Sequence, residues 1–176
     1  MRFKFLRVFG VGLLVLLAPS SATASQTTVF PDGFYAISTG SATIGARAAT
    51  GSGGVIAWTG TRSYWVRTSV YNIFGTRVFT FKSGVYWEWE NRTVTKCSRY
   101  SPSVSKGSLP WAITMTYQNG PAWWFLWKGH VHGGRYLSVT GHIEASIFRY
   151  GVVGRWNVQH AYKVYGNGYC WWESTI

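Results

Sequence analysis

The closest pair of carboxylates in the sequence is formed by Glu88 and Glu90, within a stretch of alternating aromatic and polar residues. On one face of a strand they would lie about 7 Å apart, because each residue advances a strand by about 3.4 Å. That separation overlaps the range between the two catalytic carboxyl groups of glycosidases. Glycosidase carboxylates, however, flank the scissile bond from opposite sides, whereas these two point the same way. We favour cross-strand pairing with Lys or Arg and predict no catalytic residue.

Histidines are the second group of residues that could carry chemistry. His130 and His132 have the spacing that places two rings on one side of a strand, and His142 with Glu144 could add ligands. Zinc takes three or four such groups, and a catalytic zinc keeps one position open. No fixed metal signature surrounds these residues, so we predict surface or half-buried histidines, His160 included, with no metal and no cofactor. A Ser-His-Asp triad is not supported, because the only aspartate lies near the N-terminus and no GxSxG motif occurs.

Aromatic residues crowd into residues 122–127, where Trp123, Trp124 and Trp127 accompany Phe125 without polar alternation. Such a run fits a strand buried on both sides, or an exposed platform on which sugar faces or nucleobases stack. Four aromatic side chains in five positions cannot all share one strand face, so at least one should be exposed or lie in a second core. We favour the core interpretation.

The candidate ligand-binding residues are therefore Trp123, Trp124, Trp127, Glu88 and Glu90.

Cys97 and Cys170 are the only two cysteines. In an exported protein they would most simply form one disulfide bond. That bond would close a loop of more than seventy residues, and the chain-entropy model gives it about 4 kcal/mol of stabilisation. A free catalytic or redox thiol is the alternative, which we disfavour because neither cysteine lies in a CxxC motif.

The N-terminus has the pattern of an export signal. A positively charged start, an apolar run over residues 8–17 and a small-residue cleavage motif over 22–24 predict a signal peptide at 1–24. A retained membrane anchor is the rival interpretation, but the run is shorter than the roughly 18 apolar residues that a span needs. No second run of that length follows. We therefore expect a secreted, extracellular domain over 25–176 with no membrane span after signal removal.

The expected mature chain is strongly basic. Three of the 17 Lys and Arg residues lie in the signal, which leaves 14 against 5 Asp and Glu, a net charge of +9. Such a surface attracts anionic partners, although it also keeps an aromatic-rich protein soluble. The basic residues are spread singly and form no block, so we do not expect a nucleic acid partner.

Turn residues separate short runs of alternating aromatic and β-branched residues, which predicts nine or ten strands. Residues 25–54 are expected to be a flexible or loosely held N-terminal stretch, with 25–31 flexible, 33–38 a first short strand, and 39–54 a loop or loosely held edge strand. Residues 98–110, with two prolines, are expected to form a surface loop, and 119–121 to end a strand. The turns recur every 8–12 residues, which favours an all-β, antiparallel β-sandwich of one domain, with a β-barrel as the alternative.

Alternation also predicts which residues face the core. The expected inward residues are Val66, Val70, Phe79, Phe81, Val85, Trp87, Trp89, Leu137, Val139, Ile143, Trp156, Val158, Tyr162 and Val164.

The signal-like start, residues 71–81, residues 85–89 and the late segment 166–170 together resemble small secreted proteins of high-GC Gram-positive bacteria that lack a known activity. The resemblance implies an exported, disulfide-bearing β-sandwich and carries no implication about catalysis. From all these features we expect a non-enzymatic protein that binds an extracellular or cell-surface polymer, either polyanionic or carbohydrate. The alternatives are a cationic antimicrobial or toxin-like protein and a metal-dependent hydrolase.

Overall fold

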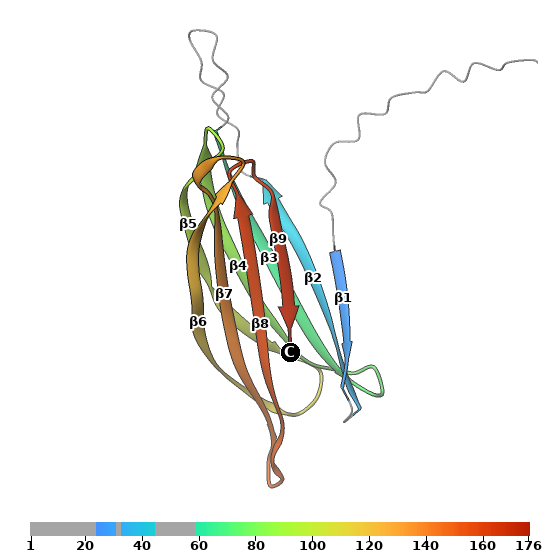
Figure 1. Cartoon of the computed structure of the whole chain (residues 1–176). Helices are drawn as coiled ribbons and strands as arrows, with labels where there is room; N and C mark the ends of the chain where they lie inside the picture. Colours follow the sequence, from blue (N-terminus) through green and yellow to red (C-terminus); the bar gives the residue numbers. More distant parts are fainter. Residues whose placement is uncertain (1–23, 31–32, 45–58) are drawn as a thin grey trace, which may run out of the picture.

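The structure, a computed structural model, describes residues 24–30, 33–44 and 59–176. Its strands are β1 (Ala24–Val29), β2 (Phe34–Ile44), β3 (Thr59–Asn72), β4 (Arg77–Glu90), β5 (Thr93–Lys106), β6 (Ala112–Trp127), β7 (His130–Ile147), β8 (Gly151–Tyr165) and β9 (Cys170–Thr175). Strands β1 to β5 form one sheet in chain order, and β6 to β9 form the other. The two sheets pack together as a sandwich (Figure 1), which confirms the predicted fold class and excludes the closed barrel.

Every strand runs antiparallel to the strand before it within its sheet, so the connections alternate between two ends of the sandwich. The upper end carries the β4–β5, β6–β7 and β8–β9 turns (Figure 1). The lower end carries the β1–β2, β3–β4, β5–β6 and β7–β8 connections. At the upper end, Asn91 and Arg92 have φ angles of 46° and 65°, as a two-residue hairpin turn of the primed type requires. The meander thus brings turns that are far apart in sequence to the same end.

The predicted inward residues form the core, with one exception: Trp89 is only half-buried and packs at its margin. Two apolar clusters fill the space between the sheets. The upper cluster includes Trp87, Leu137 and Tyr162, and the lower includes Phe79, Phe81 and Ile143. Burying each large aromatic or aliphatic side chain stabilises the fold by about 1.5–3 kcal/mol.

Buried hydroxyl groups surround His160, which is fully buried, and link the two sheets. The His160 Nδ1 lies 2.6 Å from Ser83 Oγ, and its Nε2 lies 2.8 Å from Thr68 Oγ1. Ser38 and Ser174 extend this network through Thr68. Burial lowers the pKa of His160 to about 3, because the charged ring would lose its hydration. This result corrects the prediction that every histidine lies at the surface or half-buried.

Two expected breaks turn out to lie inside strands. Residues 98–106 belong to β5, an edge strand, and Pro102 sits where the pairing with β4 shifts register. Residues 119–121 lie inside β6, where the pairing with β7 also shifts. In both places a bulge lets proline remain within a strand, since the extra residue needs no ladder hydrogen bond.

The expected N-terminal stretch is partly ordered into strands. Residues 24–29 form β1, and residues 34–44 form β2, which pairs on both sides. Residues 31–32 and 45–54 of that stretch, and residues 1–23 of the predicted signal peptide at 1–24, lie outside the described residues. Within the described residues, no helix has the length and apolar character needed to cross a membrane.

The predicted disulfide between Cys97 and Cys170 is absent, because the structure has both residues as free thiols. Both side chains lie against the upper apolar cluster. Burial raises the pKa of Cys97 to about 12, and burial together with the nearby Cys97 raises the pKa of Cys170 as well. Because the thiolate is the species that attacks in disulfide chemistry, these protonated thiols are poorly reactive.

Candidate functional site

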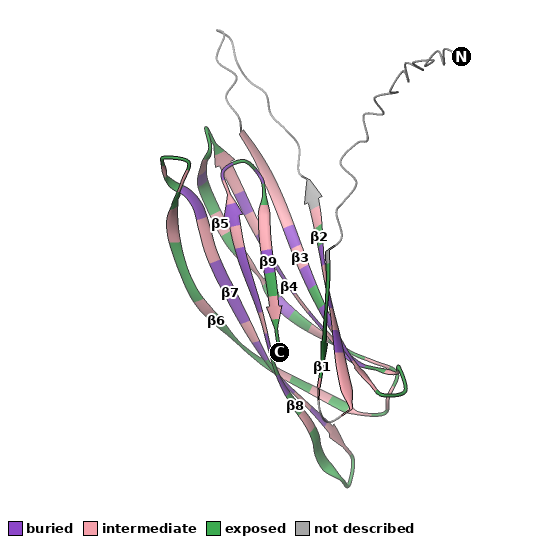
Figure 2. Cartoon of the chain, turned by 45° about the vertical axis from the view of Figure 1, so that its right-hand side comes forward, coloured by how far each residue is buried: buried purple, intermediate pink, exposed green. Residues whose placement is uncertain are grey.

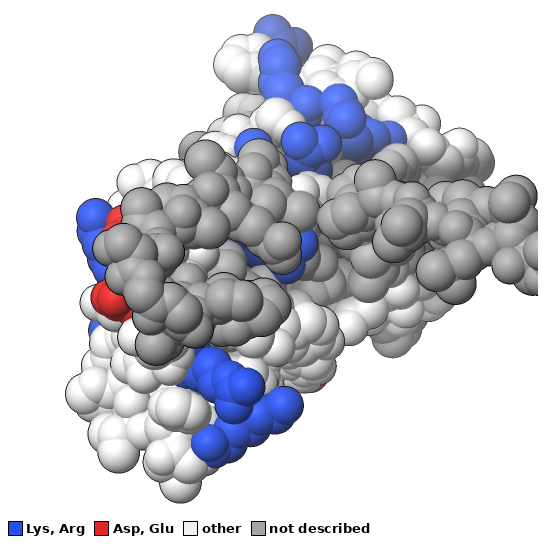
Figure 3. Space-filling view, turned by 90° about the horizontal axis from the view of Figure 1, so that it is seen from above, with Lys and Arg blue, Asp and Glu red and all other residues white. Residues whose placement is uncertain are grey.

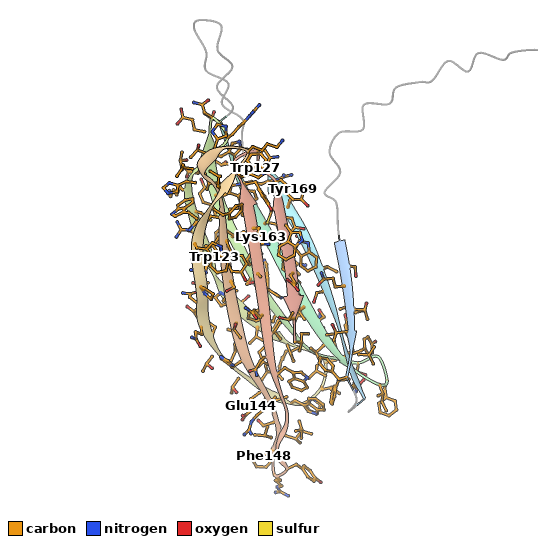
Figure 4. The ribbon with its side chains drawn as sticks, viewed as in Figure 1. Trp123, Trp127, Glu144, Phe148, Lys163 and Tyr169 are labelled. Carbon is orange, nitrogen blue, oxygen red and sulfur yellow. The ribbon has the colours of Figure 1, made fainter. Side chains whose placement is uncertain are left out.

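Aromatic side chains cover the upper half of the outer face of the second sheet, on strands β6 to β9. We call this surface the aromatic face; its members are Trp123, Phe125, Trp127, Tyr136, Lys163, Tyr165, Tyr169 and Trp171. Figure 4 shows Trp123, Trp127, Lys163 and Tyr169 together on the upper part of this sheet. The face includes two of the predicted tryptophans, Trp123 and Trp127.

Strand register builds the first row of the aromatic face. Trp123 pairs with Tyr136, Tyr136 with Lys163, and Lys163 with Trp171, so that one residue from each of four strands lies in line. The rings of Trp123 and Tyr136 stack at 3.9 Å with an angle of 16°. The Lys163 Nζ lies 4.8 Å from the centre of the Trp171 ring, a cation–π arrangement. The row is therefore a line of side chains that runs across the four strands, in which the Trp123 and Tyr136 rings cover one face of each other.

A second row lies two residues further along the strands, nearer the upper end. Phe125 faces Gly134, and a Cβ at that glycine would come within 2.2 Å of the phenyl ring. Without a side chain at Gly134, Phe125 can meet Tyr165 edge to face at 5.4 Å. Tyr165 also contacts Tyr169 at 5.6 Å. The small residue thus lets aromatic rings spread sideways across the sheet.

Trp127 continues this row upward, since its ring meets Tyr165 at 5.6 Å.

Two members of the aromatic face are strongly exposed: Trp123 at 48% and Tyr169 at 55%. Burial raises the pKa of Tyr165, so its phenol stays neutral and can donate a hydrogen bond. Flat rings with neutral hydroxyl donors and one cation match the apolar faces and hydroxyl groups of sugar rings. The chemistry of this surface is stacking and hydrogen bonding, and its only charged member is Lys163.

A pocket of about 270 Å³ adjoins the aromatic face at the upper end. It is lined by Thr59, Trp89, Arg92, Trp127, Lys128, Gly166 and Asn167. Trp127 belongs to both the pocket and the aromatic face, which makes the two continuous. Figure 3, a view onto this end, shows Lys and Arg side chains in several patches and Asp and Glu mostly on one side. The pocket therefore combines two indole rings with two cations and an amide.

Backbone contacts between turns hold the pocket wall in place. Arg92 forms an isolated antiparallel bridge with Gly166, and the Gly166 N–H donates to the Gly133 carbonyl at 2.9 Å. A Cβ at Gly166 would collide with the Arg92 carbonyl, so this close approach requires glycine. From below, the Arg62 guanidinium donates to the Gly168 carbonyl at 2.6 Å. These contacts fix the β4–β5 and β8–β9 turns relative to each other and to strands β7 and β3.

Glu88 and Glu90 lie on the same strand, β4, and Glu88 is held by local contacts. Glu88 accepts a hydrogen bond from the Tyr86 hydroxyl at 2.6 Å and lies 3.4 Å from the Lys96 ammonium, its cross-strand partner. These contacts, the Tyr86 hydrogen bond first, lower the pKa of Glu88. The cross-strand pairing that the sequence favoured is confirmed for Glu88. Glu88 and Glu90 line a shallow hollow of about 250 Å³, which shares Trp89 with the pocket.

The histidines considered as metal ligands do not converge. His130 and His132 lie at the upper start of β7, whereas His142 lies ten residues beyond His132 on the same strand, a distance of roughly 34 Å. His142 is already bonded to Asn157 at 2.7 Å, and Glu144 is bonded to Arg155 at 2.9 Å. Among the residues that the structure describes, no three His, Cys, Asp or Glu side chains could share a metal ion.

Trp124 differs from its neighbours because its side chain lies on the opposite face of β6. Its ring packs against the upper core cluster, beneath the Arg135 guanidinium at 4.4 Å and beside His132 at 4.8 Å. The three predicted tryptophans therefore divide between two faces of the strand. No tryptophan of this run is fully buried, so the core interpretation of residues 122–127 is wrong for Trp123 and only partly right for Trp124.

Six members of the aromatic face were not predicted as site residues: Phe125, Tyr136, Lys163, Tyr165, Tyr169 and Trp171. A signal was present for some of them, because Tyr136 precedes the inward residue Leu137 and Lys163 lies between the inward residues Tyr162 and Val164. What joins them to Trp123 is the register between strands, which the sequence pattern does not define.

A scan against protein-family models, a search of curated proteins and a search of solved structures each found no match. The resemblance to small secreted proteins of high-GC Gram-positive bacteria stays a prediction.

Proposed function

We propose that this protein is a non-enzymatic binding module that holds a carbohydrate polymer outside the cell through its aromatic face. The single observation that carries the proposal is the row of Trp123, Tyr136, Lys163 and Trp171 across four neighbouring strands. Trp123 is exposed and Tyr136 and Trp171 are half-buried, so a chain of sugar rings that follows the row would meet aromatic surface on three of the four strands. Since the rings already lie in place, little side-chain entropy is lost on binding.

The shape of the site supports a polymer over a small molecule. Small-molecule sites are usually concave and enclose most of the ligand, whereas the aromatic face lies on the outside of a sheet. The adjoining pocket, with Arg92 and Lys128, would receive one acidic group or branch of the same chain. The basic net charge would add a salt-dependent attraction if the polymer is acidic. The extracellular location rests on the predicted signal peptide at 1–24.

A pull-down on insoluble polysaccharides tests the proposal. We expect the protein to bind at least one of cellulose, chitin and peptidoglycan sacculi at low salt. Trp123→Ala should weaken that binding by roughly tenfold, because losing one stacked ring costs on the order of 1–3 kcal/mol. Binding that weakens further with added salt would identify an acidic polymer.

Trp65→Ala is the matched control. Trp65 also lies on an outer sheet face, stacked on Tyr100 at 4.4 Å, but on the first sheet. We expect this variant to bind as the unmodified protein does. The proposal fails if the unmodified protein binds none of the three polymers at low salt, or if Trp65→Ala weakens binding as much as Trp123→Ala.

A further inference from the structure

The lower end of the sandwich carries bare apolar side chains on two separate hairpin turns. In the β3–β4 turn, Phe74 is 83% exposed and Ile73 is 67% exposed. In the β7–β8 turn, Phe148 is 85% exposed and Tyr150 is 82% exposed. Figure 2 shows both turns as exposed tips at the same end, with the β7–β8 hairpin projecting furthest. We call these four residues the apolar tips.

The composition of these turns needs an explanation, because turns usually carry Gly, Asn, Asp, Pro or Ser. The backbone of each turn is held by its own hydrogen bonds. Asn72 Oδ1 accepts from the N–H groups of Phe74 and Thr76, and the Tyr150 N–H donates to the Ile147 carbonyl. The turn framework therefore fixes the tips without using their side chains, which are left facing outward.

Positive charge accompanies the tips. Arg149 lies between Phe148 and Tyr150, with its guanidinium 5.6 Å from the Phe148 ring. Arg77 and Lys106 are exposed at the same end, at the start of β4 and the end of β5.

Within the described residues, Glu144 is the acid nearest this end, and it is paired with Arg155 at 2.9 Å. Asp32 belongs to the β1–β2 connection and lies outside the described residues. Among the acids that the structure describes, none pairs with Arg77, Lys106 or Arg149.

Aromatic side chains that lie next to Arg or Lys favour docking at a membrane–water interface. Aromatic rings settle at the level of the lipid headgroups. Apolar surface enters the acyl boundary while cations bind anionic headgroups, and both contributions are needed for stable attachment without a span. A flat bilayer also fits two tips that project from one end, since both can touch it at once.

We infer that the lower end docks onto the surface of a lipid bilayer that contains anionic headgroups, inserting Phe74, Phe148 and Tyr150 at the interface. Docking leaves the aromatic face, at the other end, turned away from the membrane. The inference does not depend on the proposed polymer binding, because it uses no residue of the aromatic face.

Co-sedimentation with lipid vesicles tests this inference. We expect binding to vesicles of 30% phosphatidylglycerol in phosphatidylcholine, and weaker binding to pure phosphatidylcholine. Combining Phe74→Ala with Phe148→Ala should lower the affinity for the anionic vesicles roughly tenfold or more, from the apolar surface withdrawn from the bilayer. Combining Phe74→Trp with Phe148→Trp should restore it, since tryptophan also prefers the interface.

Trp123→Ala is the control and should bind vesicles normally. All the variants replace exposed side chains, and an unchanged thermal midpoint would show that each is folded. The inference is overturned if neither vesicle is bound, if the double alanine variant binds as the unmodified protein does, or if Trp123→Ala loses vesicle binding equally. It is also overturned if sedimentation shows a dimer that the double alanine variant dissociates, because the tips would then bind a second copy of this chain.

Discussion

The two ends of the sandwich use the same kinds of residue in opposite ways. At the upper end, Trp89 and Trp127 lie in a pocket wall beside Arg92 and Lys128, and backbone contacts join the β4–β5 and β8–β9 turns to each other and to the start of β7. At the lower end, Phe74, Phe148 and Tyr150 are more than 80% exposed on turns that project from the sandwich (Figure 2). Aromatic and basic composition therefore does not define one type of binding. In our two proposals, the arrangement of these residues is what distinguishes binding of a polymer chain from docking onto a flat membrane.

The two apolar clusters beneath these ends are distinct, and the His160 network lies with them between the sheets. Substitutions in one cluster should affect one end of the sandwich, and changes to the network should affect both ends. The expected changes in the free energy of unfolding range from several kcal/mol to none.

The largest effect is expected from Trp87→Ala in the upper cluster. Trp87 is fully buried, contacts Trp89 at 6.1 Å and donates from Nε1 to the Tyr165 carbonyl at 3.3 Å. Removing the indole should lower the free energy of unfolding by about 3–5 kcal/mol and loosen the upper end, so polysaccharide binding should fall. Denaturant unfolding and the pull-down measure the two effects.

Phe81→Ala is the counterpart in the lower cluster, with a similar expected loss of stability. In conditions where it remains folded, it should keep its polysaccharide binding. If Trp87→Ala and Phe81→Ala reduced polysaccharide binding equally, the two ends could not be perturbed independently.

An intermediate effect on the free energy of unfolding is expected from lowering the pH. The pKa of His160 is about 3 in the folded protein and about 6.5 when unfolded. Below pH 6.5 the unfolded chain binds a proton that the folded protein does not, so the free energy of unfolding falls as pH falls. The slope is about 1.4 kcal/mol per pH unit, or about 2 kcal/mol between pH 6.5 and 5. Denaturant unfolding at several pH values measures it.

His160→Gln should remove that slope, whatever its own stability at neutral pH. Because the network joins both sheets, acid unfolding should involve the whole sandwich. Polysaccharide binding and vesicle binding should therefore be lost over the same pH range. The assignment is wrong if the slope between pH 6.5 and 5 is the same in both proteins.

The smallest effect is expected from replacing the acids of the upper end, Glu88→Gln with Glu90→Gln. Glu88 makes its ion pair at a partly exposed site, where such pairs contribute little. The thermal midpoint and polysaccharide binding should therefore stay unchanged. Loss of binding would mean that the acids contact the polymer and would move the site from the aromatic face toward the hollow around Trp89.

Much of the fold was predictable because alternation in these strands is regular. Trp156, Val158, Tyr162 and Val164 are buried as predicted. The same alternation places His160 inward, between Val158 and Tyr162, yet its polarity argued for the surface. Its burial becomes understandable only with Ser83 and Thr68, which come from the opposite sheet.

The second half of β5 was missed for a different reason. Serines and Pro102 argue against a strand, and only an edge position with a bulge accommodates them. Trp123 and Trp127 were named as candidate binding residues, but the core interpretation was favoured for their stretch, and the extent of the site was not predicted. Tyr136, Lys163 and Trp171 join Trp123 through pairings between strands that are separated by many residues.

The order of the strands has one more consequence. Within the described residues, the chain passes from the first sheet to the second only between β5 and β6, at residues 107–111. Each sheet is thus encoded by one continuous part of the chain and built from neighbouring hairpins, which close short loops and form quickly compared with distant pairings. Folding can proceed as the assembly of two locally encoded halves, joined late when their apolar faces meet. Substitutions in one half can then accumulate with little effect on strand pairing in the other.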